Sequence, residues 1–229
     1  MQREPEPELM EGSEQVRAYA EADFAEAHDL FVALLRARFP HARPRRALDL
    51  GCGPCDVTRR FARAYPDCSI TAVDGSAAML AEARTRNRSA GLEQRIELLE
   101  ARLPAPSLAG RRFDLVLSNS LLHHLPEPSI LWRSVQDAVA PGARVFVMDL
   151  LRPTSPAAAL ALVEAHASAA PAVLRHDFHR SLLAAYRLDE VEAQLRDAGL
   201  RSLRVEVVSD RHWIAWGALG RDDALGSRA

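Results

Sequence analysis

A glycine-rich turn near residue 50 holds the first residues whose types suggest chemistry. Asp49 ends a short apolar run, Gly51 and Gly53 follow, and an amphipathic segment begins after Cys55. This pattern predicts a strand, a tight turn and a helix. Glycine lets the main chain approach a bound molecule closely, and the first free N–H groups of a helix point toward a ligand above the strand. The sequence therefore predicts a ligand-binding turn.

A second acid, Asp74, ends the next apolar run. Its distance from Asp49 is typical of a mononucleotide-binding βαβ unit, which offers a carboxylate to a ribose diol. Gly75 and Ser76 follow, and Ser76 is placed to cap the next helix. Two adjacent histidines, His123 and His124, can supply a general base near neutral pH. Either histidine can equally hold the loop through a hydrogen bond to the backbone.

Three motifs occur in order: Asp49-Leu-Gly51-Cys-Gly53, Ala72-Val73-Asp74 and Phe113-Asp114-Leu-Val-Leu-Ser-Asn119. This series resembles the ordered motifs of class I S-adenosylmethionine-dependent methyltransferases, and Ser118-Asn119-Ser-Leu-Leu-His123-His124-Leu is similar to their small-molecule members. The resemblance covers roughly residues 45 to 218. It implies a Rossmann-like three-layer α/β fold with a seven-stranded, mainly parallel sheet whose last strand is antiparallel. It also implies S-adenosylmethionine as cofactor and S-adenosylhomocysteine as product, with transfer to O, N or S of a small polar molecule.

The resemblance implies cofactor contacts at the strand ends, from Asp49, Gly51, Cys52, Gly53, Asp74, Gly75, Ser76, Ala101, Arg102, Leu103, Ser118 and Asn119. The family usually has an acid where this chain has Arg102. Arginine cannot accept a hydrogen bond, so we hypothesise that the backbone of Ala101 or Leu103 binds the adenine instead. The family counterpart of His124 is the more regular histidine of the pair, so we predict His124 as the catalytic residue and leave a scaffold role open.

Topology predicts where the methyl acceptor binds. Parallel α/β sheets bind ligands at the carboxyl ends of their strands, and in this family the last strand returns to that edge. We therefore expect Asp149, Arg152, Asp210, Arg211 and His212 to converge there. A helical lid over 13–42 and a helical insertion over 152–187 would close the site. The predicted substrate-binding residues are Tyr19, His123, Asp149, Arg152, Asp177, His179, Arg211 and His212.

Other uses of the acceptor-site residues stay open. Arg152 or Arg211 would meet a carboxylate or phosphate of the substrate. The alternative is a set of ion pairs that pins the insertion. His176, His179 and His212 could bind a metal, but their spacing does not support it, and no metal is expected.

Cys52-Gly-Pro-Cys55 is a rival motif. It matches the active-site tetrapeptide of thioredoxin-like oxidoreductases, where a thiolate at a helix N-terminus has a lowered pKa. A thiol–disulfide oxidoreductase is therefore a second hypothesis. A third is a non-catalytic cofactor-binding module, because Cys55 replaces a glycine of the family and Arg102 replaces an acid. Oxidation of the cysteine pair could also distort the turn and switch a methyltransferase off.

Composition sets the outer limits. The 229 residues, 48% of them hydrophobic, predict one α/β domain over 13–220. A net charge of −2 without long charged blocks favours neither nucleic acid nor a membrane, so a small polar or anionic molecule is the expected partner. Three cysteines and an acidic, Pro-broken start predict a cytoplasmic protein without a signal peptide. We expect residues 1–12 to be flexible, since alternating Glu and Pro cannot bury surface, and 221–229 to be a loose tail.

Overall fold

A computed structural model describes residues 1–220 apart from 7–11, 13–15, 17, 21 and 23. The predicted loose tail over 221–229 lies outside the described residues. So do residues 13–15, 17, 21 and 23 of the predicted lid over 13–42. Seven strands form one sheet in the order β3-β2-β1-β4-β5-β7-β6. Their bounds are β1 Arg46–Leu50, β2 Ser69–Asp74, β3 Ile96–Glu100, β4 Phe113–Asn119, β5 Val139–Leu150, β6 Arg204–Val207 and β7 His212–Ala218.

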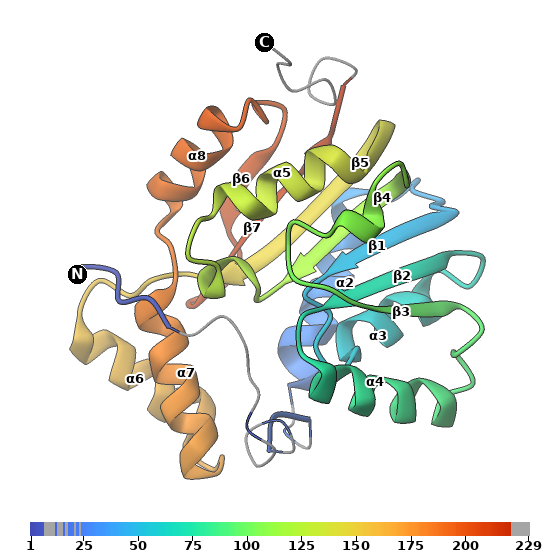
Figure 1. Cartoon of the computed structure of the whole chain (residues 1–229). Helices are drawn as coiled ribbons and strands as arrows, with labels where there is room; N and C mark the ends of the chain where they lie inside the picture. Colours follow the sequence, from blue (N-terminus) through green and yellow to red (C-terminus); the bar gives the residue numbers. More distant parts are fainter. Residues whose placement is uncertain (7–11, 13–15, 17, 21, 23, 221–229) are drawn as a thin grey trace.

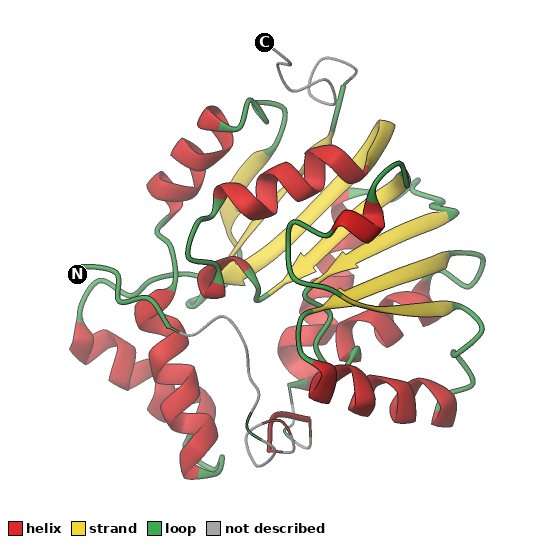
Figure 2. Ribbon diagram, viewed as in Figure 1, coloured by secondary structure: helices red, strands yellow, loops and turns green. Residues whose placement is uncertain are grey.

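The strand directions confirm the predicted architecture. The pairs among β1 to β5 are parallel, whereas β7 runs antiparallel to both β5 and β6. Helices cover both faces of the sheet, which gives three layers (Figures 1 and 2). The helices are α2 Ala25–Arg38, α3 Asp56–Ala64, α4 Ala77–Ser89, α5 Ser129–Ala138, α6 Pro156–Ala167, α7 Ala172–Ala184 and α8 Leu188–Asp197, with short 3-10 turns η1 Pro106–Leu108 and η2 Leu122–His124.

Alternating side chains of the central strands divide the core into two clusters. In β4, Val116 packs among the residues of α5 and α8, while Leu115 and Leu117 pack among those of α2, α3 and α4. Trp132 and Phe61 are fully buried in the first and second cluster respectively. A strand buried on both faces needs apolar residues at every position, and this explains the continuous apolar runs in the sequence.

Strand β5 begins at Val139, before the Pro141-Gly142 pair, and contains that pair. Val139 pairs with Phe113, and the register then shifts before Arg144 pairs with Leu115. The Pro-Gly segment is therefore an irregularity within the strand.

The insertion forms a hairpin of α6 and α7 beyond the carboxyl end of β5 (Figure 1). Residues 1–6, which we call the N-terminal strap, lie against it. Glu4 N donates to Leu183 O at 3.0 Å, and Arg3 Nε donates to Ala184 O at 2.6 Å. The expectation that this acidic segment buries no surface is wrong for the strap, because the Glu6 side chain is only 8% exposed. Within the described residues, no helix combines the length and the apolar composition that crossing a membrane requires.

Candidate active site

A cavity of about 820 Å³ lies at the carboxyl ends of β1, β2 and β4. All the predicted cofactor residues except Ser118 line it. The predicted acceptor residues that line it are Tyr19, His123, Asp177, Arg211 and His212, together with His124 as the predicted catalytic residue. Asp149, Arg152 and His179 do not line the cavity.

The glycine turn is held tightly against its neighbours. Gly51 N and Cys52 N both donate to Val73 O, at 2.8 and 3.0 Å, which fixes the turn to the end of β2. Gly51 has a φ of 74°, and a Cβ at this position would come within 2.9 Å of the Leu121 side chain. Both its backbone conformation and the space around it therefore require glycine.

Cys55 occupies the position where the family has its third glycine, and it keeps a glycine-like backbone. Its φ and ψ are 62° and 31°, in the left-handed region, and its side chain is fully buried at the start of α3. Among the described non-glycine residues, only Ser120 shares a positive φ. The left-handed conformation costs a non-glycine residue about 1 kcal/mol. The substitution therefore preserves the shape of the turn at a small cost in stability.

Asp74 is fixed by the turn that it faces. Its two carboxylate oxygens accept hydrogen bonds from Gly53 N and Ser76 N, both at 2.8 Å. Ser76 in turn caps α4 as predicted, since its Oγ accepts from Met79 N at 3.3 Å. Burial raises the pKa of Asp74, while the backbone donors oppose this shift. A carboxylate held at the cavity wall is well placed to accept hydrogen bonds from a diol.

Asp49 is a buried acid at the floor of the cavity. It is 2% exposed, and Thr58 Oγ1 donates to its Oδ2 at 2.6 Å. Burial raises the pKa of Asp49 to about 6, because its hydrogen-bond donor is a neutral hydroxyl that only partly offsets the loss of water. A ligand that brings positive charge into the cavity would favour the ionised form.

His123 is oriented by an acid from the neighbouring strand. Its Nδ1 lies 2.5 Å from Asp149 Oδ1, and both side chains are almost fully buried. Asp149 also accepts from Leu122 N at 2.7 Å and Leu150 N at 2.6 Å. Burial alone would lower the pKa of His123, but the charge and hydrogen bond of Asp149 outweigh it and raise the pKa. Asp149 thus orients His123 and does not reach the cavity, where we expected it to meet the substrate.

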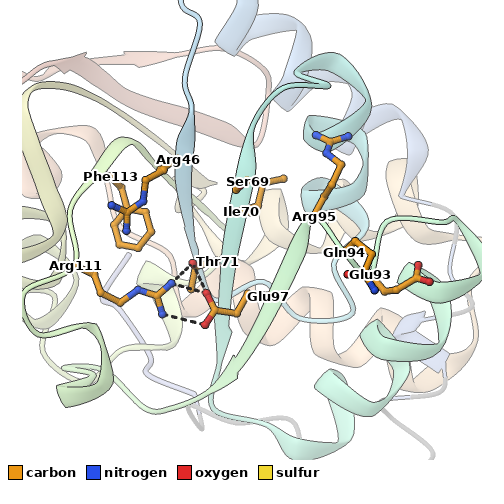
Figure 3. A pocket seen from close by; sticks show the side chains of 10 residues that line it. All are labelled: Arg46, Ser69, Ile70, Thr71, Glu93, Gln94, Arg95, Glu97, Arg111 and Phe113. Atoms are coloured by element: carbon orange, nitrogen blue, oxygen red, sulfur yellow. Dashed lines mark hydrogen bonds and ion pairs between the residues drawn. The ribbon is translucent and has the colours of Figure 1, made fainter.

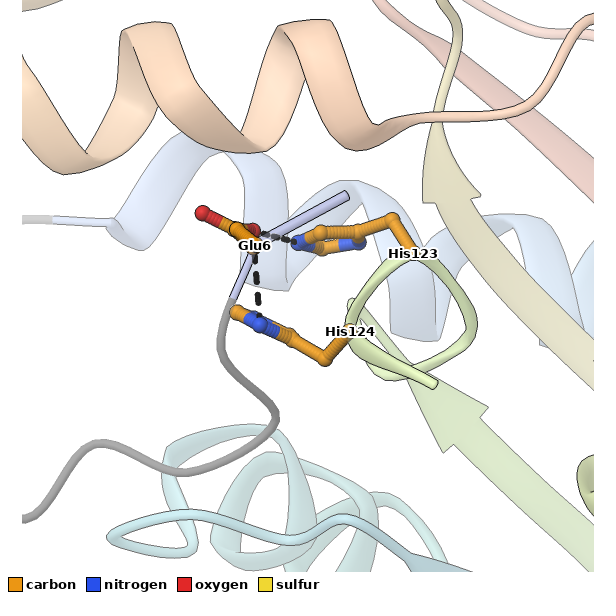
Figure 4. A group of neighbouring side chains, drawn as sticks. All are labelled: Glu6, His123 and His124. Atoms are coloured by element: carbon orange, nitrogen blue, oxygen red, sulfur yellow. Dashed lines mark ion pairs between the residues drawn. The ribbon is translucent and has the colours of Figure 1, made fainter. Parts of the chain in front are cut away.

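The strap contributes a residue that sequence reasoning missed. Glu6 Oε1 lies 3.4 Å from His123 Nε2 and 3.3 Å from His124 Nδ1, so that it contacts the edges of both rings (Figure 4). The ring centroids of the two histidines are 4.2 Å apart. Among the described residues, these three form the group whose ligand atoms lie close enough to share a metal ion. His176, His179 and His212, which we weighed as metal ligands from the sequence without predicting a site, form no such group among the described residues.

The predicted ionic cluster separates into independent pairs. Arg152 NH2 meets Glu190 Oε1 of α8 at 2.5 Å and turns away from the cavity. Arg211 NH1 contacts Asp210 Oδ1 and His166 Nε2, each at 2.9 Å. Convergence of all five residues is therefore wrong, because three of them do not line the cavity and each arginine pairs with an acid of the protein. The alternative of ion pairs that pin the insertion describes Arg152 and Arg211 better.

Two further predicted contacts need correction, and a third side chain differs from its expected state. Ser118 is fully buried and its Oγ donates to Leu50 O at 2.9 Å, so it supports the sheet and does not face the cavity. His179 Nε2 is buried without a hydrogen-bond partner, outside the cavity. His212 does line the cavity, but burial lowers its pKa to about 4, and its Nδ1 contacts Ser209 Oγ at 2.9 Å. His212 is consequently neutral at pH 7.

The cysteine pair lacks the features of a redox centre. Cys52 and Cys55 are free and buried. Burial raises the pKa of the Cys52 thiol, and the nearby thiol and carboxylates add to this shift. A reactive thiol needs a lowered pKa and access to its partner. This geometry disfavours the oxidoreductase hypothesis.

A smaller cavity of about 220 Å³ lies at the opposite, amino end of the strands (Figure 3). Arg111 crosses it to Glu97 and donates to Thr71 Oγ1 at 2.6 Å. Thr71, Glu97 and Arg111 bond to one another, which indicates a structural role for these three side chains.

Comparison with known proteins identifies the family. Residues 47–142 match the model of a family described as a methyltransferase domain. The chain is 30% identical over 198 residues to 27-O-demethylrifamycin SV methyltransferase of Amycolatopsis mediterranei, a match that covers 85% of this chain and 68% of that protein. The chain belongs to the class I S-adenosylmethionine-dependent methyltransferases.

Two other methyltransferases are similar to this one, the first in sequence and the second in structure. It is 36% identical over 124 residues to trans-aconitate 2-methyltransferase of Methylobacterium nodulans, covering 54% of this chain and 45% of that protein. The methyltransferase thus matches less than half the length of this curated relative. The plantazolicin methyltransferase BpumL, solved with a pentazolic desmethylPZN analogue and S-adenosylhomocysteine, has the same fold, with a TM-score of 0.70, 13% identity, and coverage of 91% of this chain and 90% of that one. S-adenosylmethionine is the cofactor of this methyltransferase.

Proposed function

We propose that this methyltransferase transfers the methyl group of S-adenosylmethionine to O, N or S of a small molecule bound between the glycine turn and the insertion. One observation carries this proposal: the glycine turn with Asp74 and the pair His123 and His124 face the same cavity. The first set suits a nucleoside and the second suits an acceptor that loses a proton.

The cofactor roles follow from the fixed backbone. Asp74 binds the ribose diol, and the turn from Gly51 to Gly53 lies along the rest of the cofactor. Ala101, Arg102 and Leu103 line the cavity at the exit of β3, where the backbone of Ala101 or Leu103 would bind the adenine. The bound sulfonium supplies the activated methyl group, so the protein mainly aligns the acceptor with it.

Side chains of the insertion support a proposal for the class of acceptor. Leu174 and Phe178 of α7 line the cavity together with Leu150 at the end of β5. His212 is neutral, and the charge of Arg211 is offset by Asp210. These features favour an acceptor with an apolar body and a hydroxyl or amine over the small polar or anionic molecule that we first expected.

The two named relatives act on different molecules and so do not fix the acceptor. By their names, one acts on trans-aconitate and the other on 27-O-demethylrifamycin SV. The apolar lining makes the second a better guide to acceptor class than the first. A screen should therefore contain hydroxylated aromatic and polyketide-like compounds beside polycarboxylates.

The test has two stages. Calorimetric titration with S-adenosylmethionine and S-adenosylhomocysteine should give micromolar binding that Asp74→Ala weakens by about tenfold to a hundredfold, because Asp74 binds the ribose and holds Gly53 and Ser76. Asp67→Ala, which changes an acid outside the cavity, is the matched control. Formation of S-adenosylhomocysteine in the acceptor screen then measures turnover. Equal affinity for the cofactor in the Asp74→Ala and Asp67→Ala variants would refute the assignment of the cofactor half.

A further inference from the structure

Glu6, His123 and His124 have the geometry of metal ligands. Glu6 Oε1 lies 3.4 Å from His123 Nε2 and 3.3 Å from His124 Nδ1, and all three ligand atoms lie within 4.8 Å of one another. Two ligands about 2.0 to 2.1 Å from one tetrahedral ion are about 3.4 Å apart. Two edges of a coordination tetrahedron are therefore already present (Figure 4).

The oxygen of Glu6 that faces both histidines lacks a hydrogen-bond partner. Glu6 Oε1 is buried and has no hydrogen-bond partner. A buried carboxylate oxygen without a partner costs free energy, because it has lost its water. The oxygen points at two ring nitrogens, so a cation among these three atoms would supply the missing partner.

A carboxylate behind His123 completes the pattern. Asp149 Oδ1 lies 2.5 Å from the other ring nitrogen of His123, and the backbone N–H groups of Leu122 and Leu150 hold Asp149 in place. Histidines that bind metals usually donate their second ring N–H to such a carboxylate, which fixes the tautomer and aims the free nitrogen. Here that free nitrogen is Nε2, the atom that faces Glu6.

We propose that Glu6, His123 and His124 bind one divalent first-row transition-metal ion at the acceptor end of the cavity. Two imidazole nitrogens and one carboxylate oxygen suit Zn²⁺, Co²⁺, Fe²⁺ or Mn²⁺ better than Mg²⁺ or Ca²⁺, which prefer oxygen ligands. Three protein ligands leave one position open, as in catalytic zinc sites.

The open position gives the ion a role that rests on the proposed function. Both histidines line the acceptor cavity, so a hydroxyl of the acceptor can reach the ion. Coordination lowers the pKa of a hydroxyl, whose proton then passes to solvent. The acceptor oxygen forms its bond to the methyl carbon while the carbon–sulfur bond breaks and its electron pair returns to sulfur.

The experiment measures metal binding directly. Full-length protein stripped with a chelator is titrated with Co²⁺, and the visible absorption of four-coordinate Co²⁺ is recorded; Zn²⁺ is then added in competition. We expect one equivalent to saturate the band and Zn²⁺ to displace it. Glu6→Gln and His124→Ala should each weaken binding at least tenfold.

Glu4→Gln is the matched control, because Glu4 lies in the same strap but is 58% exposed and pairs with Arg180. This variant should keep the affinity for Co²⁺. Absence of the band, or equal affinity in the Glu6→Gln and Glu4→Gln proteins, would overturn the proposal and leave the group as an ion pair. Titration of the stripped protein with S-adenosylhomocysteine separates this outcome from failure of the proposed function, since the cofactor half binds without the ion.

Discussion

The two halves of the cavity are built differently. The cofactor half comes almost entirely from one stretch, from Asp49 to Leu103, and its key contacts are to backbone atoms at strand ends. The acceptor half is assembled from η2, the insertion and the β6–β7 turn, and Glu6 of the strap contacts both histidines of η2. Its contacts join side chains far apart in the chain, as Glu6 and His123 do. On the proposed assignment, the shared cofactor would therefore be bound by local backbone geometry, and the specific acceptor by side chains from distant parts of the chain.

Gly51→Ala should break the cofactor half most severely. The new Cβ would lie 2.9 Å from Leu121 on a backbone with φ of 74°, so we expect a loss of about 2 to 4 kcal/mol in stability and at least a hundredfold in affinity for S-adenosylmethionine. Chemical denaturation and calorimetry measure these effects. Gly110→Ala has a similar φ of 76° but open space around its Cβ, so it should lose only about 1 kcal/mol and keep cofactor affinity. Equal losses in both variants would show that backbone strain alone matters.

Asp149→Asn should break the acceptor half alone. The amide keeps the size of the side chain but loses the charge that orients His123, so we expect turnover to fall by about a hundredfold. Affinity for S-adenosylhomocysteine should stay within about twofold. Steady-state kinetics with the acceptor and calorimetry with the product give the two numbers. A parallel loss of cofactor affinity would mean that the halves are coupled.

The two halves also differ in how well the sequence predicts them. Gly51, Asp74 and Ser76 could be predicted because each owes its role to neighbours within a strand, turn and helix. The seven-stranded sheet with its antiparallel last strand could be predicted from the family resemblance, which rests on short motifs at strand ends. Glu6 could not, because nothing local distinguishes it from the other acids of the segment. Arg152 looked like a ligand for an anion, but residue type alone does not reveal that its NH2 group pairs with Glu190.

The sequence does contain a signal that would place Asp149 next to His123. Asp149 ends the strand next to the one that leads into His123, and adjacent parallel strands bring such residues together. Pairing acids and histidines at neighbouring strand ends would have placed Asp149 behind His123. The predicted catalytic role of His124 stays a prediction.

The pH dependence of binding should show how much of the affinity of the cofactor half depends on the charge of the ligand and how much on its shape. Burial raises the pKa of Asp49 to about 6, so the unliganded site holds a proton below that pH. Cationic S-adenosylmethionine favours the ionised carboxylate, and its affinity should fall about tenfold as pH drops from 7 to 5. Neutral S-adenosylhomocysteine should change much less. In Asp49→Asn the difference between the two ligands should disappear, as calorimetry at several pH values would reveal.

Linkage fixes the sign of the effect of Asp49 on stability. The folded protein binds this proton more tightly than the unfolded chain, whose aspartate has a pKa near 3.9. The free energy of unfolding should therefore decrease as pH rises from about 4 through about 6 and then level off. Asp49→Asn should flatten this part of the profile in urea titrations. An unchanged slope would assign the pH dependence to other groups.

Cys55→Gly should have the smallest effect. Glycine relieves the left-handed strain at φ of 62°, but the loss of a fully buried side chain opposes the gain, so we expect stability within about 1 kcal/mol of wild type. Turnover should be unchanged with or without a reductant. Thermal unfolding and the methyl-transfer assay check both expectations. A large loss of activity in this variant would instead reveal a chemical role for the thiol.

The ends of the insertion lie side by side. Leu151 and Tyr186 form an isolated β-bridge, and Arg152 N donates to Tyr186 O at 3.2 Å. The hairpin of α6 and α7 therefore leaves the sheet and rejoins it at one place. Because both ends of the insertion lie at one place, it can be lengthened, shortened or exchanged without a change in the order or connections of the strands. We therefore expect evolution to change the acceptor by replacing the insertion, while the residues of the proposed cofactor site stay the same.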